Sequence, residues 1–247
     1  MRNRMRSRIK IEENSGDIQL GTLISIPLSD FPTLRSCHQK HCPSTIELES
    51  FGAMILPHLA DGSATASQLI DFIDAVLDWG GISRVKGGVK RGWNSRNLQL
   101  AGKAAKGLAE LEVLPNCSSE SFTADEARAA LAATTLAVKM FNSEFGFKGL
   151  QMASGTKIVR MLAPRFAPVY DSMVRASFGV HDGDQTFEDF SAYSLSSWAL
   201  SKHLLHSGVG NPSRGNSPEW FAADIDAAIF AALRHHNNEW LDCTVLI

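Results

Sequence analysis

Apolar side chains recur at helical spacing over most of this chain. The clearest case begins at Thr65, which forms a capping box with Gln68 and so satisfies amides at the start of a helix. Gly80 and Gly81 then end the segment, because glycine is common just past a helix. The apolar positions between these two signals are Leu69, Phe72, Ile73, Val76 and Leu77. The pattern predicts an amphipathic helix.

Further helices are predicted from caps and from apolar spacing. Thr123 and Glu126 form a second capping box, which opens a long alanine-rich helix that ends near Phe141. Ser217 as N-cap and Pro218 at the first helical position open a final helix. The remaining predicted helices cover residues 97–111, 156–162, 171–178 and 187–206. Helices therefore make up most of the predicted structure.

The N-terminal part departs from this pattern. Residues 1–15 contain closely spaced arginines and are predicted to form a basic tail. Residues 17–28 carry β-branched side chains in partial alternation and predict one strand or an extended edge. The prolines that follow predict an irregular segment, and they are Pro27, Pro32 and Pro43. We expect a mainly α fold with a short extended N-terminal segment.

Composition narrows the class of protein. A chain of 247 residues can bury a full core, so we expect residues 16–247 to form one domain or two helical lobes around a cleft. With 44% hydrophobic and 20% charged residues, the chain has the composition of a folded globular protein. No apolar run approaches bilayer length, and Glu12 and Glu13 stand where a signal peptide needs an apolar stretch. We expect a cytoplasmic protein without a membrane partner.

Positive charge is local rather than global. The net charge is −2, so any binding to nucleic acid must come from a patch. Residues 84–106 carry seven cations and no acid. Within this segment we expect Lys90, Arg91 and Arg96 to contact phosphates and Trp93 to contact a base. The alternative is a solvated basic loop with one half-buried tryptophan.

The cysteines predict neither a disulfide framework nor a metal site. The chain contains four, which are too scattered for a framework, and reduced thiols suit a cytoplasmic protein. Cys37, His38, His41 and Cys42 lie close together in the sequence, but their spacing is too tight for a four-ligand zinc finger. We therefore expect no metal and no cofactor, with a loop that contains incidental Cys and His residues.

The stretch from Ser154 to Val174 is the candidate for chemistry. Gly155 is predicted to lie in a hairpin that opens a short apolar helix with Lys157 in its first turn. The partial positive charge at a helix N-terminus disfavours a lysine cation and favours the neutral amine. The neutral amine is the nucleophilic form of lysine. A loop with Pro164 and Pro168 follows, and Asp171 is predicted to start the next helix.

This order of residues resembles the helix-hairpin-helix, Gly/Pro-rich, Asp motif of base-excision DNA glycosylases. It is most similar to the 8-oxoguanine DNA glycosylase branch, the OGG-fold proteins. The resemblance implies a helical glycosylase-like fold and a Lys157 amine that attacks the sugar C1′ and displaces the base. It also implies that Asp171 stabilises the cationic sugar, and that amides of Ser154, Gly155 and Thr156 contact a phosphate.

The chain departs from the family in two places. Where the family has Leu-Pro-Gly-Val-Gly or a close variant, residues 151–155 read Gln-Met-Ala-Ser-Gly, so that the last glycine alone is kept. Positions 157 and 171 are fourteen apart, which is a few fewer than in typical members. The iron–sulfur version of the family needs four closely spaced cysteines near the C-terminus, and this chain lacks them.

The residues leave other functions open. Lys157 could be a solvated surface lysine, and Asp171 could serve only as an N-cap. The main expectation is a DNA glycosylase and lyase that removes an oxidised purine, with DNA or a nucleotide as partner. One alternative is a non-catalytic nucleic-acid or nucleotide-binding module. Another is an accessory enzyme of a bacterial defence system that acts on a nucleobase.

Overall fold

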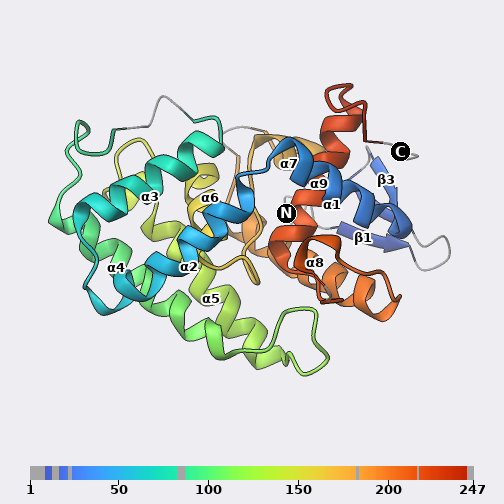
Figure 1. Cartoon of the computed structure of the whole chain (residues 1–247), viewed down its shortest axis with the longest axis horizontal. Coiled ribbons are helices and arrows are strands. Elements are labelled where there is room, and N and C mark those ends of the chain that lie inside the picture. Colours follow the sequence, from blue (N-terminus) through green and yellow to red (C-terminus); the bar gives the residue numbers. More distant parts are fainter. Residues whose placement is uncertain are drawn as a thin grey trace. The chain divides into compact units, whose positions relative to one another are not determined.

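A computed structural model describes residues 9–12, 17–21, 24–82, 87–181, 184–215 and 217–243, and Figure 1 shows the chain. Helices dominate these residues, and the strands are confined to the N-terminal part, which confirms the expected fold class. The contacts divide the chain into two compact units. Unit 1 comprises residues 1–43, 115–123 and 170–247, whereas unit 2 comprises residues 44–114 and 124–169.

Unit 1 begins with an antiparallel sheet in the order β1-β2-β3, formed by Ile9–Glu12, Asp17–Leu20 and Ile24–Pro27. Two predictions are therefore wrong. Residues 9–12 belong to the sheet and not to a tail, because Ile9 pairs with Leu20 and is buried. The single predicted strand is a hairpin, since Gly21 has a left-handed φ of 61° that ends β2. Residues 1–8 of the predicted tail lie outside the described residues.

Helix α1 (Phe31–His41) occupies the segment that we expected to be irregular. Pro32 lies in its first turn, where a missing N–H costs no helical hydrogen bond, so proline does not prevent the helix. A 3-10 turn, η1 (Leu28–Asp30), leads into it. Cys37 forms a disulfide with Cys243, so the expectation of reduced thiols is wrong for this pair. Residues 37–41 of the predicted loop therefore lie on a helix, and Cys42 follows its end.

The other helices of unit 1 are α7 (Ser172–Ser177), α8 (Phe187–His206) and α9 (Ala222–His236), with a 3-10 turn η5 (Pro212–Arg214). Helix α9 packs against α1, α7, α8 and β3, and its residues are buried on almost every side. The predicted start of this helix at Ser217 is wrong. Its first turn instead begins after Phe221, whose amide donates to the Asp224 carboxylate at 3.3 Å.

Unit 2 consists of helices α2 (Thr45–Asp61), α3 (Ala66–Trp79), α4 (Ser95–Ala109), α5 (Ala124–Met140) and α6 (Met152–Leu162) and 3-10 turns η3 (Glu110–Val113) and η4 (Ser143–Phe145). The capping box of Thr65 and Gln68 is present at the start of α3, as predicted. The alanine-rich helix is confirmed as α5. Helix α2, which contains Pro57, was not among the predicted helices.

Helix α6 is the central element of unit 2. It packs against α2, α3 and α5, and its residues from Ser154 to Leu162 are all buried. Two glycines allow these helices to approach closely. A Cβ at Gly52 of α2 would lie 1.9 Å from the Met161 carbonyl oxygen, and a Cβ at Gly155 would lie 3.0 Å from the Val138 carbonyl oxygen. The residues at these crossings must therefore be small.

None of the helices in the described part of the chain has both the length and the apolar character needed to span a bilayer.

Candidate active site

Lys157 lies in the second turn of α6, because the helix begins at Met152. The expectation that Lys157 occupies a first turn is therefore wrong, and the reasoning from the helix terminus does not apply to it. The solvated-surface alternative is also wrong, since only 9% of the residue is exposed. Lysine is rarely buried to this extent, and such a position is a candidate for function.

The glycine at the end of α3 makes room for the Lys157 side chain. A Cβ at Gly80 would lie 2.8 Å from Lys157 Cδ and 3.2 Å from Cε, so the stem of the lysine packs directly against this residue. Gly80 has a φ of −75°, which any residue can adopt, so its backbone does not require glycine. A side chain at position 80 would therefore disturb the packing of the Lys157 stem and not the backbone.

The hairpin predicted over residues 150–155 is not present, because α6 begins at Met152. Ser154, Gly155 and Thr156, which we expected to contact a phosphate, all lie within this helix. The Gly155 amide donates to the Gln151 carbonyl at 2.9 Å, and the Thr156 hydroxyl donates to the Ala153 carbonyl at 3.0 Å. The Gly155 amide is therefore already used within the helix and is not offered to a phosphate. Ser154 is the third helical residue, and all three residues are buried. Gly155 is required by packing against α5 rather than by a turn.

Asp171 is the N-cap of α7, as its position in the sequence predicted. Its Oδ1 accepts from the amides of Met173 at 3.0 Å and Val174 at 3.1 Å, which fixes the carboxylate at the helix start. The residue is buried. Asp171 belongs to unit 1, whereas Lys157 belongs to unit 2.

Acidic groups within unit 1 also act on Tyr193. Burial raises the pKa of this phenol well above its usual value, and the charges of Asp226 and then Asp171 raise it further. The phenol donates to Asp226 Oδ1 at 3.1 Å, and its ring lies 5.8 Å from that of Tyr170. Tyr193 therefore remains a neutral hydrogen-bond donor over the whole physiological range of pH.

The predicted nucleic-acid contacts divide into exposed and buried residues. Lys90, Arg91 and Arg96 are exposed, which suits phosphate contacts. Trp93 is buried, so stacking on a base is excluded for this ring in the described structure. Its ring packs edge-on against Phe147 with centroids 5.5 Å apart, and a Cβ at Gly88 would lie 1.9 Å from it. Arg84 and Lys86 lie outside the described residues.

The loop that carries these cations is tied to α3 by an acid. The Gly87 amide lies 3.2 Å and 3.1 Å from the two carboxylate oxygens of Asp74. Helix α4 continues the basic segment from Arg96, with exposed Lys103 and Lys106. Lys103 and Lys106 follow Arg96 by seven and ten residues, so the three side chains fall on one side of the helix. The exposed cations in the described part of this basic segment are Lys90, Arg91, Arg96, Lys103 and Lys106, and we call this set the basic face.

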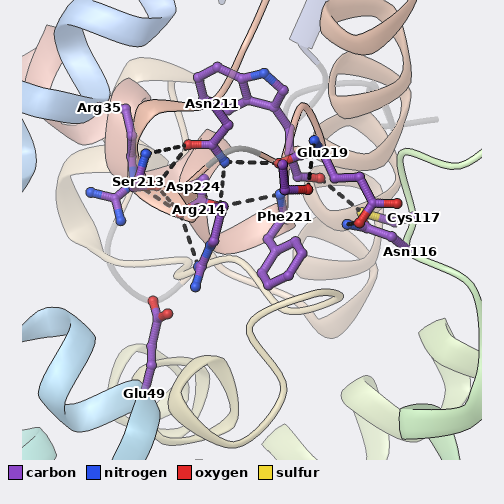
Figure 2. A network of polar contacts seen from close by, with 12 residues as sticks. Arg35, Glu49, Asn116, Cys117, Asn211, Ser213, Arg214, Glu219, Phe221 and Asp224 are labelled. Carbon is purple, nitrogen blue, oxygen red and sulfur yellow. Dashed lines mark hydrogen bonds and ion pairs between the residues drawn. The ribbon is translucent and has the colours of Figure 1, made fainter.

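A buried polar network in unit 1 was missed from the sequence (Figure 2). Asp224 accepts from Arg35 Nε at 2.9 Å and from Arg214 Nε and Nη2 at 2.9 Å and 3.1 Å. Asn211 and Ser213 also donate to it. Burial alone would raise the pKa of Asp224, but Arg214 and Arg35 lower it to about 2. In the sequence, the one local feature that favours a charged Asp224 is its place in the first turn of α9, where acidic side chains are stabilised.

The network holds η5 and α1 to the start of α9, and we assign it a structural role. Its carboxylate is completely buried and saturated by donors, which leaves it no proton or lone pair for a substrate. A second buried pair joins Arg160 of α6 to Glu49 of α2 at 3.1 Å, with the Arg160 guanidinium over the Trp79 ring. Both pairs link residues far apart in sequence, so local patterns did not reveal them.

The described residues that could hold a metal ion are Cys37, His41, Asp242 and Cys243 of unit 1. The sequence identified the first two as part of a cluster but not their partners near the end of the chain.

No family model, curated protein or solved structure matches this chain.

Proposed function

We propose that this protein is a DNA glycosylase and lyase that removes an oxidised purine. The resemblance to the glycosylase motif assigns the role of nucleophile to Lys157 and the role of the carboxylate that stabilises the cationic sugar to Asp171. The observation that carries the proposal is the nearly buried lysine on the central helix of unit 2, whose stem packs against Gly80. Lysine is seldom buried to this extent, and a buried lysine packed in this way is a candidate functional group.

The reaction consists of two bond changes at one carbon. The neutral amine of Lys157 attacks the sugar C1′, a C–N bond to the lysine forms, and the glycosidic C–N bond to the base breaks. The base leaves with the bonding electron pair and takes up a proton. Ring opening of the sugar then gives an imine between Lys157 and C1′, from which elimination of the 3′ phosphate follows.

Asp171 serves this reaction by carrying a fixed negative charge. Positive charge develops on the sugar as the glycosidic bond breaks, and a carboxylate placed in advance stabilises it without reorganisation. The two amides at the start of α7 hold Asp171 Oδ1 in one orientation. The capping role and the catalytic role are therefore compatible in a single side chain.

The choice of nucleic acid as partner is supported by the basic face on unit 2. Its cations are exposed, and a basic patch of this kind neutralises phosphates and releases counterions. The net charge of −2 means that this local face must provide the attraction.

The test measures base release from duplexes, single strands and nucleotides that carry oxidised or alkylated bases. We expect release of an oxidised purine from DNA, with loss of activity in Lys157→Gln. Asp171→Asn should slow release on the order of a hundredfold, because asparagine caps a helix nearly as well but carries no charge. Lys148→Gln, an exposed lysine of the same unit that lies outside the basic face, is the matched control and should retain activity.

Absence of base release by the wild-type protein from every substrate would contradict the proposal. Specific binding without release would then favour the non-catalytic binding module. Equal activity in wild type and Lys157→Gln would show that the lysine is not the nucleophile, whichever substrate is used.

A further inference from the structure

Four potential metal ligands meet in unit 1 at the junction of α1 and the segment after α9. Cys37 and His41 lie four residues apart and share one face of α1. Asp242 and Cys243 come from the other end of the sequence. The ligand atoms of all four residues lie within 4.8 Å of one another. Helices α1 and α9 pack together, which places the chain after α9 beside this face (Figure 1).

We propose that the reduced protein binds one zinc ion through Cys37, His41, Asp242 and Cys243. Two sulfurs, one imidazole and one carboxylate form the kind of donor set that zinc takes in tetrahedral sites. Calcium and magnesium prefer oxygen donors alone, so the two sulfurs disfavour them. The tight spacing between Cys37 and Cys42 is no obstacle, since Cys42 is not a ligand.

The geometry between His41 and Asp242 supports this assignment. Nε2 of His41 lies 2.8 Å from Oδ1 of Asp242, so the imidazole and the carboxylate converge next to the two sulfurs. A zinc ion would take the place of the proton that these two groups share. Lys40 Nζ lies 2.5 Å from the other carboxylate oxygen and orients Asp242 from outside the ligand set.

Aromatic contacts that do not involve the ligand atoms hold the ligands in position. The His41 ring stacks on Trp240 with centroids 4.4 Å apart and an interplanar angle of 10°. Trp240 in turn packs edge-on against Phe230 of α9, and its carbonyl oxygen lies 3.0 Å from His235 Nδ1. The chain that carries Asp242 and Cys243 is thus fixed to α9 in advance of any metal.

The disulfide between Cys37 and Cys243 and the zinc site are alternative states of the same two sulfurs. Their Cα atoms are 5.7 Å apart. Reduction of the disulfide by a dithiol consumes two electrons and two protons, and zinc then displaces the two thiol protons into the solvent. A disulfide needs neither the imidazole nor the carboxylate that flank it, whereas a zinc ion uses both. A chain of this length also needs no disulfide to supplement its core.

The test is metal analysis of the full chain, purified under a dithiol reductant without added zinc and then titrated with zinc chloride. We expect about one zinc ion per chain. Cobalt in its place should give a sulfur-to-cobalt charge-transfer band. Cys243→Ser should remove the ion, whereas Cys42→Ser, which changes a neighbouring cysteine outside the set, should retain it.

Asp242→Asn is the second variant, because its side chain is partly exposed and its substitution spares the fold. We expect it to weaken zinc binding about tenfold or more, as loss of a ligand or of a hydrogen-bonded partner does. Three results would each overturn the proposal: no zinc in the reduced wild-type protein, zinc retained fully in Cys243→Ser, or equal affinity in Asp242→Asn and wild type. Circular dichroism checks the fold of each variant.

Discussion

At the scale of single residues, Asp224 makes the free energy of unfolding depend on pH. Its folded pKa of about 2 lies below the ordinary value of an aspartate, so its contribution is fully present above about pH 4 and is lost as pH falls through about 2. The size of this contribution is about 2 kcal/mol. We expect the free energy of unfolding to fall over this range of pH, as measured by urea titration at several pH values.

The variant Asp224→Asn should remove this dependence and lower the free energy of unfolding by about 3–5 kcal/mol, because it removes the buried charge with which Arg35 and Arg214 both pair. Asp125→Asn is the matched control, since Asp125 pairs with Arg128 in full exposure, and it should change stability by less than about 1 kcal/mol. An unchanged acid dependence in Asp224→Asn would contradict the assignment of the low pKa to this residue.

Gly80 offers a test of the position of Lys157 that leaves the lysine itself intact. In Gly80→Ala the new methyl group must displace the lysine stem, while the backbone remains unstrained. On the proposed function, base release should slow by roughly tenfold or more, because small displacements of a nucleophile are costly. Gly107→Ala, whose Cβ meets nothing closer than 3.9 Å, is the control. Equal rates in both variants would mean that the lysine position is not critical.

At the scale of elements, the crossing of α2 and α6 depends on Gly52. The missing side chain admits the Met161 carbonyl, which is backbone and cannot move aside. Gly52→Ala should therefore lower the free energy of unfolding by about 1–3 kcal/mol or more, as overpacking does. Urea denaturation measures this, with Gly107→Ala as a variant that should be neutral or slightly stabilising. A neutral Gly52→Ala would show that the two helices can separate without cost.

The elements that sequence patterns predicted well are those whose signals are local. Helices α3 and α5 follow from a capping box and from alanine content, because both signals lie within the segment itself. The start of α6 was not predicted correctly, because a glycine such as Gly155 is compatible both with a turn and with a close helix crossing. Packing against Val138 decides between them, and this contact joins segments that are distant in sequence.

At the scale of the whole molecule, the proposed function makes the basic face responsible for how binding to DNA responds to salt. Neutralising Lys90, Arg91 and Arg96 together with glutamine should weaken binding to DNA. It should also reduce the slope of log K against log salt by about 2–3, because three phosphate contacts are lost. Arg128→Gln, on the exposed side of α5, should leave the slope unchanged. An unchanged slope in the triple variant would remove this face from the binding surface.

The two candidate residues for chemistry were predicted because they lie in one short stretch of the chain. Lys157 and Asp171 stand out by type and order, and the structure adds the burial of both and the packing of Lys157 on Gly80. The cluster of Cys37 and His41 with Asp242 and Cys243 could not be predicted in the same way. Its halves are separated by almost the whole chain and meet through the packing of α1 on α9.

The central claim is that the amine of Lys157 forms a covalent imine with the sugar. The most direct measurement is reduction with borohydride during the reaction of the wild-type protein with DNA that contains an oxidised purine, followed by peptide mapping of the adduct. The account predicts a stable protein–DNA adduct at Lys157 that is absent from Lys157→Gln. An adduct at another residue, or base release without any adduct, would contradict it.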